Sequence, residues 1–398
     1  MGRRTETLPG GIRFTDLVSL GALARYVPIE TVREVIASSG RKEKRVRLLP
    51  ADVTALYVVA LWLFREVSYE EVLRCLLECL RWLGSPLKVM AASKGAITQA
   101  RERLGWETMR SLFLRIARPL AKKKTVGARY RSWRTVAMDG FTLDVPDTAE
   151  NAAEFGRPGA PRGKAAYPQV RAAALAETGT RAIFACAMGA YAVGEQTLCR
   201  ELLPSLKAGM LLLADRTFLG FDLWTRAAAT KADLLWRVKR NARLPVRRRL
   251  ADGSYLSEIF PSTKDFRNRT GGVPVRVVEY TVRGSEEVHR LVTTILEAEK
   301  APALELAALY AERWEIETAF DEIKTHLKGA TINLRSKTPD LVRQEFWALM
   351  IAHWAIRSLI HEAALRQNLD PDRISFVHAV RLVKRTTPSR ADFSPSAP

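Results

Sequence analysis

Residues 309–328 carry four polar side chains whose types and spacing could act on a phosphodiester: Tyr310, Arg313, Glu317 and Lys324. The segment is rich in helix formers, contains neither Pro nor Gly, and is followed by Gly329, so the sequence predicts one helix. At about 100° per residue the four side chains fall within a sector of roughly 60°. This face combines a carboxylate with a guanidinium, an ammonium and a phenol, which suits a metal-bound phosphodiester. The alternative is an exposed helix with an ion pair between Arg313 and Glu317.

Two further carboxylates stand at the ends of predicted strands. Residues 134–143 alternate apolar and polar side chains and carry Asp139, and the continuous apolar run at 209–214 ends on Asp215. An Asp in such a place is often only a turn former. If Asp139, Asp215 and Glu317 converge, three oxygen ligands without a nearby Cys or His match Mg²⁺ or Mn²⁺.

The predicted reaction class is the cleavage and joining of phosphodiesters. Two ions about 4 Å apart would activate a water or a 3′-hydroxyl and stabilise the leaving oxygen of an in-line phosphoryl transfer. Asp321 lies on the face of Glu317, one turn further on, and competes for the role of third ligand, whereas Glu315 and Glu322 point elsewhere.

The elements that must position these carboxylates predict a fold class. Residues 134–143, 169–175 and 181–187 have the pattern of strands, residues 194–206 that of a helix, and residues 209–214 that of a buried strand. Three strands, a helix and a fourth strand ending on a carboxylate are typical of a ribonuclease-H-like α/β sheet. The chain between Asp215 and Glu317 is far longer than this sheet requires, and strand patterns at 273–282 and 289–296 predict a mostly β insertion.

The same patterns divide the chain into five parts. We expect an all-α DNA-binding domain at 1–125, the first part of the core at 126–219, the β-rich insertion at 220–298, the second part of the core with the catalytic helix at 299–365, and a C-terminal tail at 366–398. A Gly/Pro/Ala-rich loop is expected at 146–168.

The helical domain contains a candidate recognition helix at 93–105. It begins at a Ser, ends at a Gly, and carries Gln99, Arg101 and Arg103, which could contact base edges in a major groove. The alternative is a surface helix that covers the core. Residues 115–134 then contain eight basic side chains and no acid, so we expect this strip to lie along DNA phosphates.

Composition favours a polyanionic partner. The 63 Lys and Arg against 43 Asp and Glu give a formal charge of +20, and 47% of the 398 residues are apolar, as in a folded protein. The rival polyanion is a membrane surface, but no apolar run approaches the roughly 20 residues of a membrane span. Four scattered cysteines and the lack of an export signal predict a cytoplasmic protein that joins the nucleoid through double-stranded DNA.

Taken together, MDG at Asp139, LADRTF at Asp215 and Y-x2-R-x3-E-x6-K around Glu317 resemble the DDE transposases of bacterial insertion sequences, in the group named after insertion sequence four. The resemblance covers most of the chain and implies that these three carboxylates hold two Mg²⁺ or Mn²⁺ ions. It implies that the transposon-end phosphates are held by Tyr310, Arg313 and Lys324, and that the cleaved end is contacted by Arg237 and Lys239.

The resemblance also implies a reaction course and a set of partners. The implied function is binding of terminal inverted repeats followed by cut-and-paste strand transfer into target DNA. We expect a homodimer on paired ends, since one active site per protomer cannot hold both. In the best-studied members a tryptophan before the last insertion strand supports a flipped base during hairpin formation, but His289 or Arg290 stands there in this chain. The alternatives are a nuclease of the same fold and a non-catalytic DNA-binding regulator.

Overall fold

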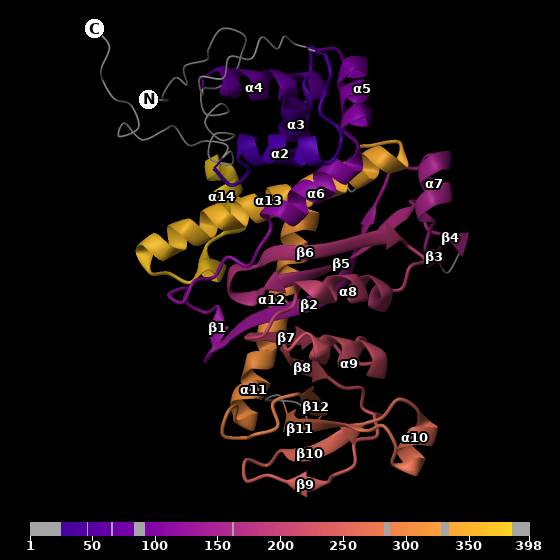
Figure 1. The fold of residues 1–398 in the computed structure, drawn as a ribbon, viewed down its shortest axis with the longest axis vertical. Coiled ribbons are helices and arrows are strands. Elements are labelled where there is room, and N and C mark those ends of the chain that lie inside the picture. The colour runs from indigo at the N-terminus through magenta and orange to yellow at the C-terminus, as the bar shows by residue number, and fades with distance from the viewer. Residues whose placement is uncertain are drawn as a thin grey trace.

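A computed structural model describes residues 25–45, 47–64, 67–82, 92–160, 163–281, 287–327 and 334–383. The part of the expected helical domain before residue 25 and the part of the expected tail after residue 383 lie outside the described residues. Residues 366–383, which were expected to belong to the tail, are folded. The described chain forms a helical N-terminal region, a sheet with helices on both faces, and a β-rich end (Figure 1). No helix in these ranges is both long and apolar enough to cross a membrane.

The N-terminal region consists of the predicted helices. They are α2 (Ile29–Ser38), α3 (Ala51–Leu63), α4 (Tyr69–Trp82), α5 (Lys94–Leu104) and α6 (Trp106–Ile116). The hydroxyl of Ser93 accepts a hydrogen bond from the amide of Ala96 and so caps α5, and Gly105 ends that helix with a φ of 74°. The helix predicted at 93–105 is therefore confirmed.

The core sheet has the order β6-β5-β2-β7-β8. Its strands are β2 (Trp133–Asp144), β5 (Gln169–Glu177), β6 (Ala182–Ala190), β7 (Met210–Ala214) and β8 (Asp233–Arg237). Strands β2, β5 and β6 form an antiparallel meander, while β7 lies parallel to β2 and β8 lies parallel to β7. This order confirms the predicted ribonuclease-H-like fold. The short β1 (Arg129–Tyr130) pairs with the start of β2.

Helices cover both faces of this sheet. On one face α8 (Glu195–Leu202) and α9 (Phe221–Ala229) pack over Met138, Leu212 and Leu234. On the other face lie α12 (Trp314–Asp321) and the long α13 (Pro339–Gln367), which is buried along most of its length. The smaller elements here are the 3-10 turns Thr178–Thr180, Leu203–Ser205 and Pro371–Arg373, and α14 (Phe376–Val383).

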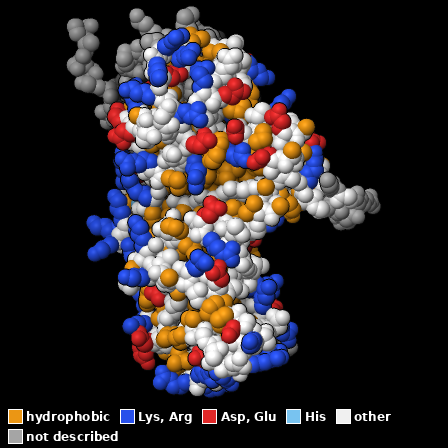
Figure 2. Space-filling view, turned by 45° about the vertical axis from the view of Figure 1, so that its right-hand side comes forward, with side chains coloured by type: hydrophobic (Ala, Val, Ile, Leu, Met, Phe, Trp, Pro, Cys, Tyr) orange, Lys and Arg blue, Asp and Glu red, His pale blue; other side chains and the backbone are white. Residues whose placement is uncertain are grey.

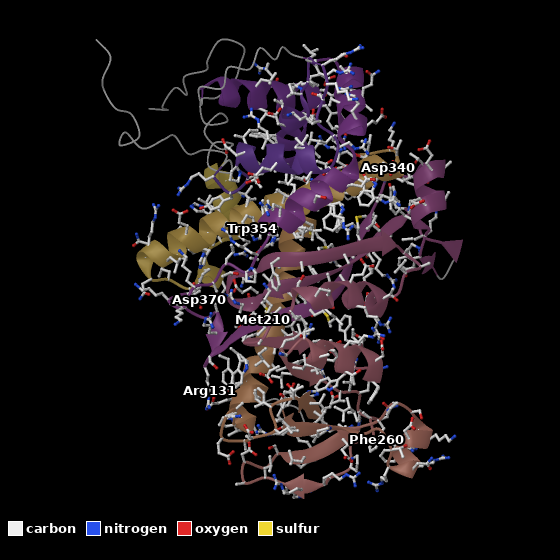
Figure 3. The ribbon with its side chains drawn as sticks, viewed as in Figure 1. Arg131, Met210, Phe260, Asp340, Trp354 and Asp370 are labelled. Atoms are coloured by element: carbon white, nitrogen blue, oxygen red, sulfur yellow. The ribbon has the colours of Figure 1, made fainter. Side chains whose placement is uncertain are left out.

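Helix α13 also packs against the N-terminal helices. The indole nitrogen of Trp62 on α3 donates to the carbonyl of Glu345, and the side chain of Arg101 on α5 bonds with Gln344. Further along, the indole nitrogen of Trp354 donates to the carbonyl of Arg118 (Figure 3). These buried contacts hold the helical region against the core.

The insertion extends the core sheet instead of forming a separate layer. Its elements are β9 (Arg248–Arg249), β10 (Tyr255–Ile259), α10 (Thr263–Asn268), β11 (Val273–Thr281) and β12 (Val288–Thr293). Strand β12 pairs antiparallel with β8, so that the five strands of the core sheet, β1 and the four strands of the insertion make one ten-stranded sheet. The two strands predicted after residue 270 are thus confirmed.

Two local predictions were wrong. Residues 309–328 are not one uniform α-helix: α11 (Ala303–Leu309) passes through a 3-10 turn (Tyr310–Arg313) into α12, and a π-turn follows at Glu322–Leu327. The π-turn breaks the spacing of 100° per residue and draws Glu322 into the protein, where it bonds with His353 and Arg357 on α13. The loop expected at 146–168 contains α7 (Ala149–Phe155), capped by Thr148, and the β3 (Gly159–Ala160) and β4 (Gly163–Lys164) pair.

Candidate active site

Asp139 and Asp215 occupy neighbouring places on adjacent parallel strands. The last paired residues of β2 and β7 in this register are Met138 and Ala214, and each aspartate is the next residue of its chain. Since successive side chains alternate between the faces of a sheet, both aspartates belong to the face opposite Met138 and Ala214. That face is the one covered by α12, because Phe141, two residues after Asp139, packs against Phe320 with the ring centroids 4.4 Å apart.

Arg313 joins the third predicted carboxylate to the first. Its Nη1 lies 3.2 Å from Oδ2 of Asp139, and its Nη2 lies 2.8 Å from Oε1 of Glu317. The Arg313 side chain is only 8% exposed, and its guanidinium also lies 5.0 Å from the ring centroid of Trp314. One cation therefore holds carboxylates from a strand and a helix that are far apart in the sequence.

Tyr310 ties the helix to the strand that carries Asp215. Its hydroxyl donates to the carbonyl of Ala214 at 3.1 Å, and its ring is buried. Burial raises the pKa of the Tyr310 phenol, with Arg313 opposing and Asp215 adding to the rise. The phenol is therefore neutral and fixes the helix relative to the end of β7.

The electrostatics of Asp139 differ from those of an exposed aspartate. Burial raises the pKa of Asp139 to about 6 against the lowering effects of the Gly140 amide and of Arg313, and the charges of Glu317 and Glu195 add to the rise. A carboxylate that has lost so much hydration needs a cation to stay ionised. In this structure Arg313 is that cation.

The donor set fits a hard divalent ion, although it is not gathered as a complete cage. Among the described residues no three His, Cys, Asp or Glu side chains lie together as a ready site. Yet Arg313 already brings Asp139 and Glu317 to one positive charge, and carboxylate oxygens are the ligands that Mg²⁺ and Mn²⁺ prefer. An ion bound there by Asp139, Asp215 and Glu317 would replace the guanidinium.

The other acids of the catalytic helix are placed differently. Glu315 pairs with Arg181, and Glu322 pairs with Arg357, so the prediction that both point away from the site is confirmed. Asp321, the predicted competitor of Glu317, is exposed.

Lys324 lies on the exposed side of the π-turn. Its Nζ is 5.9 Å from the ring centroid of Phe141, which follows Asp139 on β2. The structure therefore keeps this ammonium near the end of β2, although the regular helical spacing that predicted it is absent.

The end of β8 and the loop that follows it contribute cations beside Asp215. A guanidinium nitrogen of Arg237 lies 2.8 Å from Nδ1 of His289, and Lys239 is exposed in a hollow of about 620 Å³ with Arg216, Arg240 and Asn241. Arg290 is committed elsewhere, because it donates to the carbonyls of Lys239, Arg240 and Ala242 and so shapes this loop. The chain at 237–241 is thus held next to the residue that follows Asp215.

The three candidate recognition residues of the helical region differ in their exposure. Gln99 and Arg103 are exposed, and Arg103 lies 3.8 Å from Glu43. Arg101 is buried and donates to Gln344, to Ser336 and to the carbonyl of Leu341. The prediction that Arg101 contacts DNA is corrected here, because its guanidinium anchors α5 to the core.

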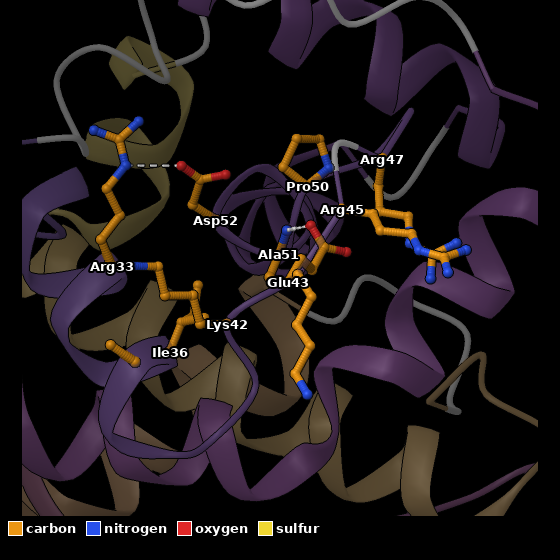
Figure 4. A pocket seen from close by; sticks show the side chains of 11 residues that line it. Arg33, Ile36, Lys42, Glu43, Arg45, Arg47, Pro50, Ala51 and Asp52 are labelled. Carbon is orange, nitrogen blue, oxygen red and sulfur yellow. Dashed lines mark hydrogen bonds and ion pairs between the residues drawn. The ribbon is translucent and has the colours of Figure 1, made fainter.

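A basic pocket lies beside these helices. It has a volume of about 560 Å³ and is lined by Arg33, Lys42, Lys44, Arg45 and Arg47 together with apolar atoms (Figure 4). Only Arg33 among these cations is drawn with an acidic partner, Asp52, at 2.8 Å. Other cations gather at the far end of the molecule, over the insertion (Figure 2).

Parts of the predicted basic strip at 115–134 are internally paired. Arg134 pairs with the buried Glu177, which also accepts from the amides of Leu120 and Ala121, and Arg131 pairs with Glu305. Arg115 lies 3.5 Å from Glu34 on the surface. Besides these paired residues, the exposed cations of the strip are Arg118 and the three lysines at 122–124.

One acidic residue beside Asp139 was missed from the sequence. Glu195 opens α8, and its carboxyl group lies over Gly140. The available signals were the glycine directly after Asp139 and the Gly194-Glu195 start of the next predicted helix, but neither indicates that the two meet.

The sheet, its insertion and the helical region define a class of protein, and comparison with known proteins gives the same class. Residues 132–355 match the family described as "Transposase DDE domain", and residues 17–114 match "Insertion element 4 transposase N-terminal". The chain belongs to the DDE transposases of the insertion element 4 type. Transposases of this family generally use divalent metal ions.

Individual relatives match half or more of the chain. It is 28% identical over 370 residues to "Transposase InsG for insertion sequence element IS4" of Escherichia coli (strain K12), which is 92% of this chain and 82% of that protein. The protein InsZ of the same strain is 25% identical over 201 residues, half of this chain and 64% of that protein. A solved piggyBac transposase synaptic complex with hairpin DNA aligns with a TM-score of 0.49 at 13% identity, over 92% of this chain and 79% of that one.

Proposed function

We propose that this transposase cleaves DNA at the terminal inverted repeats of an insertion sequence and joins the freed ends to target DNA, with Asp139, Asp215 and Glu317 as the ligands of two Mg²⁺ or Mn²⁺ ions. The observation that carries this proposal is the single guanidinium that Asp139 and Glu317 share. When bound, the ions would polarise the phosphate and lower the pKa of the attacking water or hydroxyl.

The neighbouring residues would bind and orient the DNA end. Arg313, once released from the carboxylates, and Lys324 supply cations for the phosphates next to the cleaved bond. Tyr310 keeps the helix at a fixed position on β7 through its bond with Ala214. Arg237 at the end of β8 and Lys239 in the loop after it would contact the cleaved strand, because β8 pairs with the strand that Asp215 follows.

The helical region would bind the terminal repeat. Gln99 and Arg103 on the exposed side of α5 are available for base edges, and the basic pocket at 33–52 for phosphates. Base contacts would give sequence preference, whereas the pocket would give affinity that falls with salt.

A homodimer on two paired ends is the expected assembly, since each protomer has one candidate active site and both ends must be cut. Sedimentation of a complex that is competent at both ends tests this. A complex with one protomer and two processed ends would contradict the expectation.

The decisive experiment uses the DNA that flanks the gene. Wild-type protein with Mg²⁺ should nick at the edges of the inverted repeats and join the 3′ ends to a plasmid, and Asp139→Asn should do neither while still shifting repeat DNA in a gel. Nicking without joining would favour a nuclease, and binding without any nicking by the wild type would favour a regulator.

A further inference from the structure

Glu195 lies against the backbone of the strand that carries Asp139. A Cβ atom built on Gly140 would stand 2.8 Å from Cδ and 3.1 Å from Oε1 of Glu195. At such distances a side chain at position 140 would force Glu195 to move, so the glycine makes room for this carboxylate in its present position. Because Gly140 directly follows Asp139, the two acids are close enough for the charge of Glu195 to act on Asp139.

The two acids lie on opposite faces of β2, next to the point where its pairing with β7 ends. Asp139 shares its face with Phe141 and α12, whereas Gly140 faces α8, whose Leu198 and Cys199 pack with Met138. An ion held by Asp139 beyond the end of β7 would thus have Glu317 on one side and Glu195 on the other.

Glu195 has no cation of its own. It is half-buried, and among the residues that the structure describes none forms a hydrogen bond or ion pair with its carboxylate. Its neighbours on the same surface are different: Asp222 on α9 pairs with Arg200 of α8 and with Arg226. A half-buried carboxylate beside a second one, without a counter-ion, is unfavourable unless a bound cation offsets the repulsion.

Resting on the proposed function, we propose that Glu195 is a fourth carboxylate of the divalent-ion site, acting on the ion bound by Asp139 from the α8 side. The expected ligand is a hard divalent cation with oxygen ligands, Mg²⁺ or Mn²⁺. Gly140 then has a role in the site, because it lets the carboxylate approach β2 beside Asp139.

The test measures Mn²⁺ binding to the full chain without DNA, by the electron paramagnetic resonance signal of free Mn²⁺. Glu195→Gln keeps the shape of the side chain and should weaken binding by about tenfold, the loss typical of a supporting ligand. Glu201→Gln, an exposed position on the same helix, is the matched control and should bind as the wild type does. Asp139→Asn reports on the site itself and should abolish binding.

The outcomes separate this inference from the proposed function. If Asp139→Asn abolishes Mn²⁺ binding while Glu195→Gln leaves it unchanged, the role of Glu195 is overturned and the metal site stands. If the wild type binds no Mn²⁺, or Asp139→Asn binds it normally, both are overturned. Circular dichroism confirms that each variant is folded.

A second variant tests the geometry with every carboxylate present. In Gly140→Ala the new methyl group would meet the flexible end of Glu195 and push it aside, so Mn²⁺ binding should weaken to a similar degree. The double variant Gly140→Ala/Glu195→Gln should then lose no more than either single variant, because both remove one interaction. Fully additive losses would contradict the proposal.

Discussion

Nη1 of Arg313 lies 3.2 Å from Oδ2 of Asp139, although the two residues are 174 positions apart in the chain. The contact joins the catalytic helix to the central strand, and the same guanidinium reaches Glu317. Arg313 therefore occupies the electrostatic position that a divalent ion would take. Metal binding without DNA must compete with this internal cation, while a DNA phosphate would offer Arg313 another partner and so favour the metal.

Removing this internal cation should raise the affinity for metal and lower the stability of the metal-free protein. In Arg313→Gln, Mn²⁺ affinity without DNA should rise by about tenfold, because a competing charge has gone. The metal-free protein should lose about 3 kcal/mol of stability, since Asp139 is left without its partner, and Mn²⁺ should restore it. Thermal unfolding with and without Mn²⁺ measures both. Arg226→Gln, an exposed position, is the control, and equal Mn²⁺ affinity in wild type and Arg313→Gln would count against the competition.

Neutralising the third ligand should stop chemistry without stopping DNA binding. Glu317→Gln keeps the size of the side chain and removes the charge that a hard ion needs, so nicking should fall by more than about a hundredfold. Gel shifts with repeat DNA should show equal or slightly tighter binding, because an anion near the phosphates is lost.

The matched control for that substitution is Asp321→Asn on the next turn. This variant should remain active, since Asp321 is exposed and Arg313 selects Glu317. Loss of activity in Asp321→Asn with retention in Glu317→Gln would show that the third ligand is misassigned.

Lys324→Ala should weaken DNA binding more than catalysis. This ammonium lies near the end of β2 but is assigned to a phosphate, so end affinity should drop by about fivefold to tenfold with residual nicking at saturating protein. A titration of nicking rate against protein concentration separates the two effects. A drop in the saturated rate as large as that of Glu317→Gln would place Lys324 in the chemistry instead.

The basic strand at the far end of the molecule should determine part of the salt dependence. Arg248 and Arg249 on β9 are exposed, whereas Arg247 is paired with Glu258. In the double variant Arg248→Ala/Arg249→Ala, the slope of log K for DNA binding against log salt concentration should become less steep. The change should be about 0.9 for each DNA phosphate that the protein no longer neutralises. Arg247→Ala should change this slope less. An unchanged slope in the double variant would show that β9 faces away from DNA.

A buried histidine should make the protein sensitive to acid. Burial lowers the pKa of His353 to about 3, far below its usual value, and Glu322 and Arg357 beside it are already paired. The unfolded chain therefore binds this proton more readily, so the stabilisation is complete above about pH 6.5 and is lost as the pH falls towards 3.

Denaturant unfolding between pH 7 and pH 5 measures this effect. The wild type should lose up to about 1.4 kcal/mol per pH unit more than His353→Gln does. His378→Gln, an exposed position on α14, should follow the wild type. Parallel curves for the wild type and His353→Gln would contradict the assignment.

The strands and the positions of the carboxylates were predictable because they depend on local pattern. The alternation at 134–143 and the apolar run at 209–214 identify β2 and β7, and Asp215 directly follows β7 as expected. Asp139 was expected at a strand end but lies within β2, which continues to Asp144. The exposed positions on α5 were also predictable, but the burial of Arg101 was not, since its partners Ser336 and Gln344 lie more than 230 residues away.

Other features depend on contacts that local pattern does not encode. The π-turn after α12 arises where Glu322 turns inward to Arg357, and the pairing of Arg313 with Asp139 depends on how the helix packs on the sheet. Glu195 was missed for the same reason, because only the folded chain brings α8 onto Gly140.

The attachment of the helical region to α13 fixes the distance between the candidate recognition helix α5 and the candidate active site. Trp62 and Arg101 fix α3 and α5 to the N-terminal half of α13. The packing of α13 on the sheet then places Asp139 on β2 at a set distance from α5. If α5 binds the repeat, this rigid connection fixes the distance along the DNA between the bases that α5 contacts and the phosphate that is cleaved. Inserting half a helical turn of DNA into that interval would turn the scissile phosphate away from Asp139, while a whole turn would only move it along the axis.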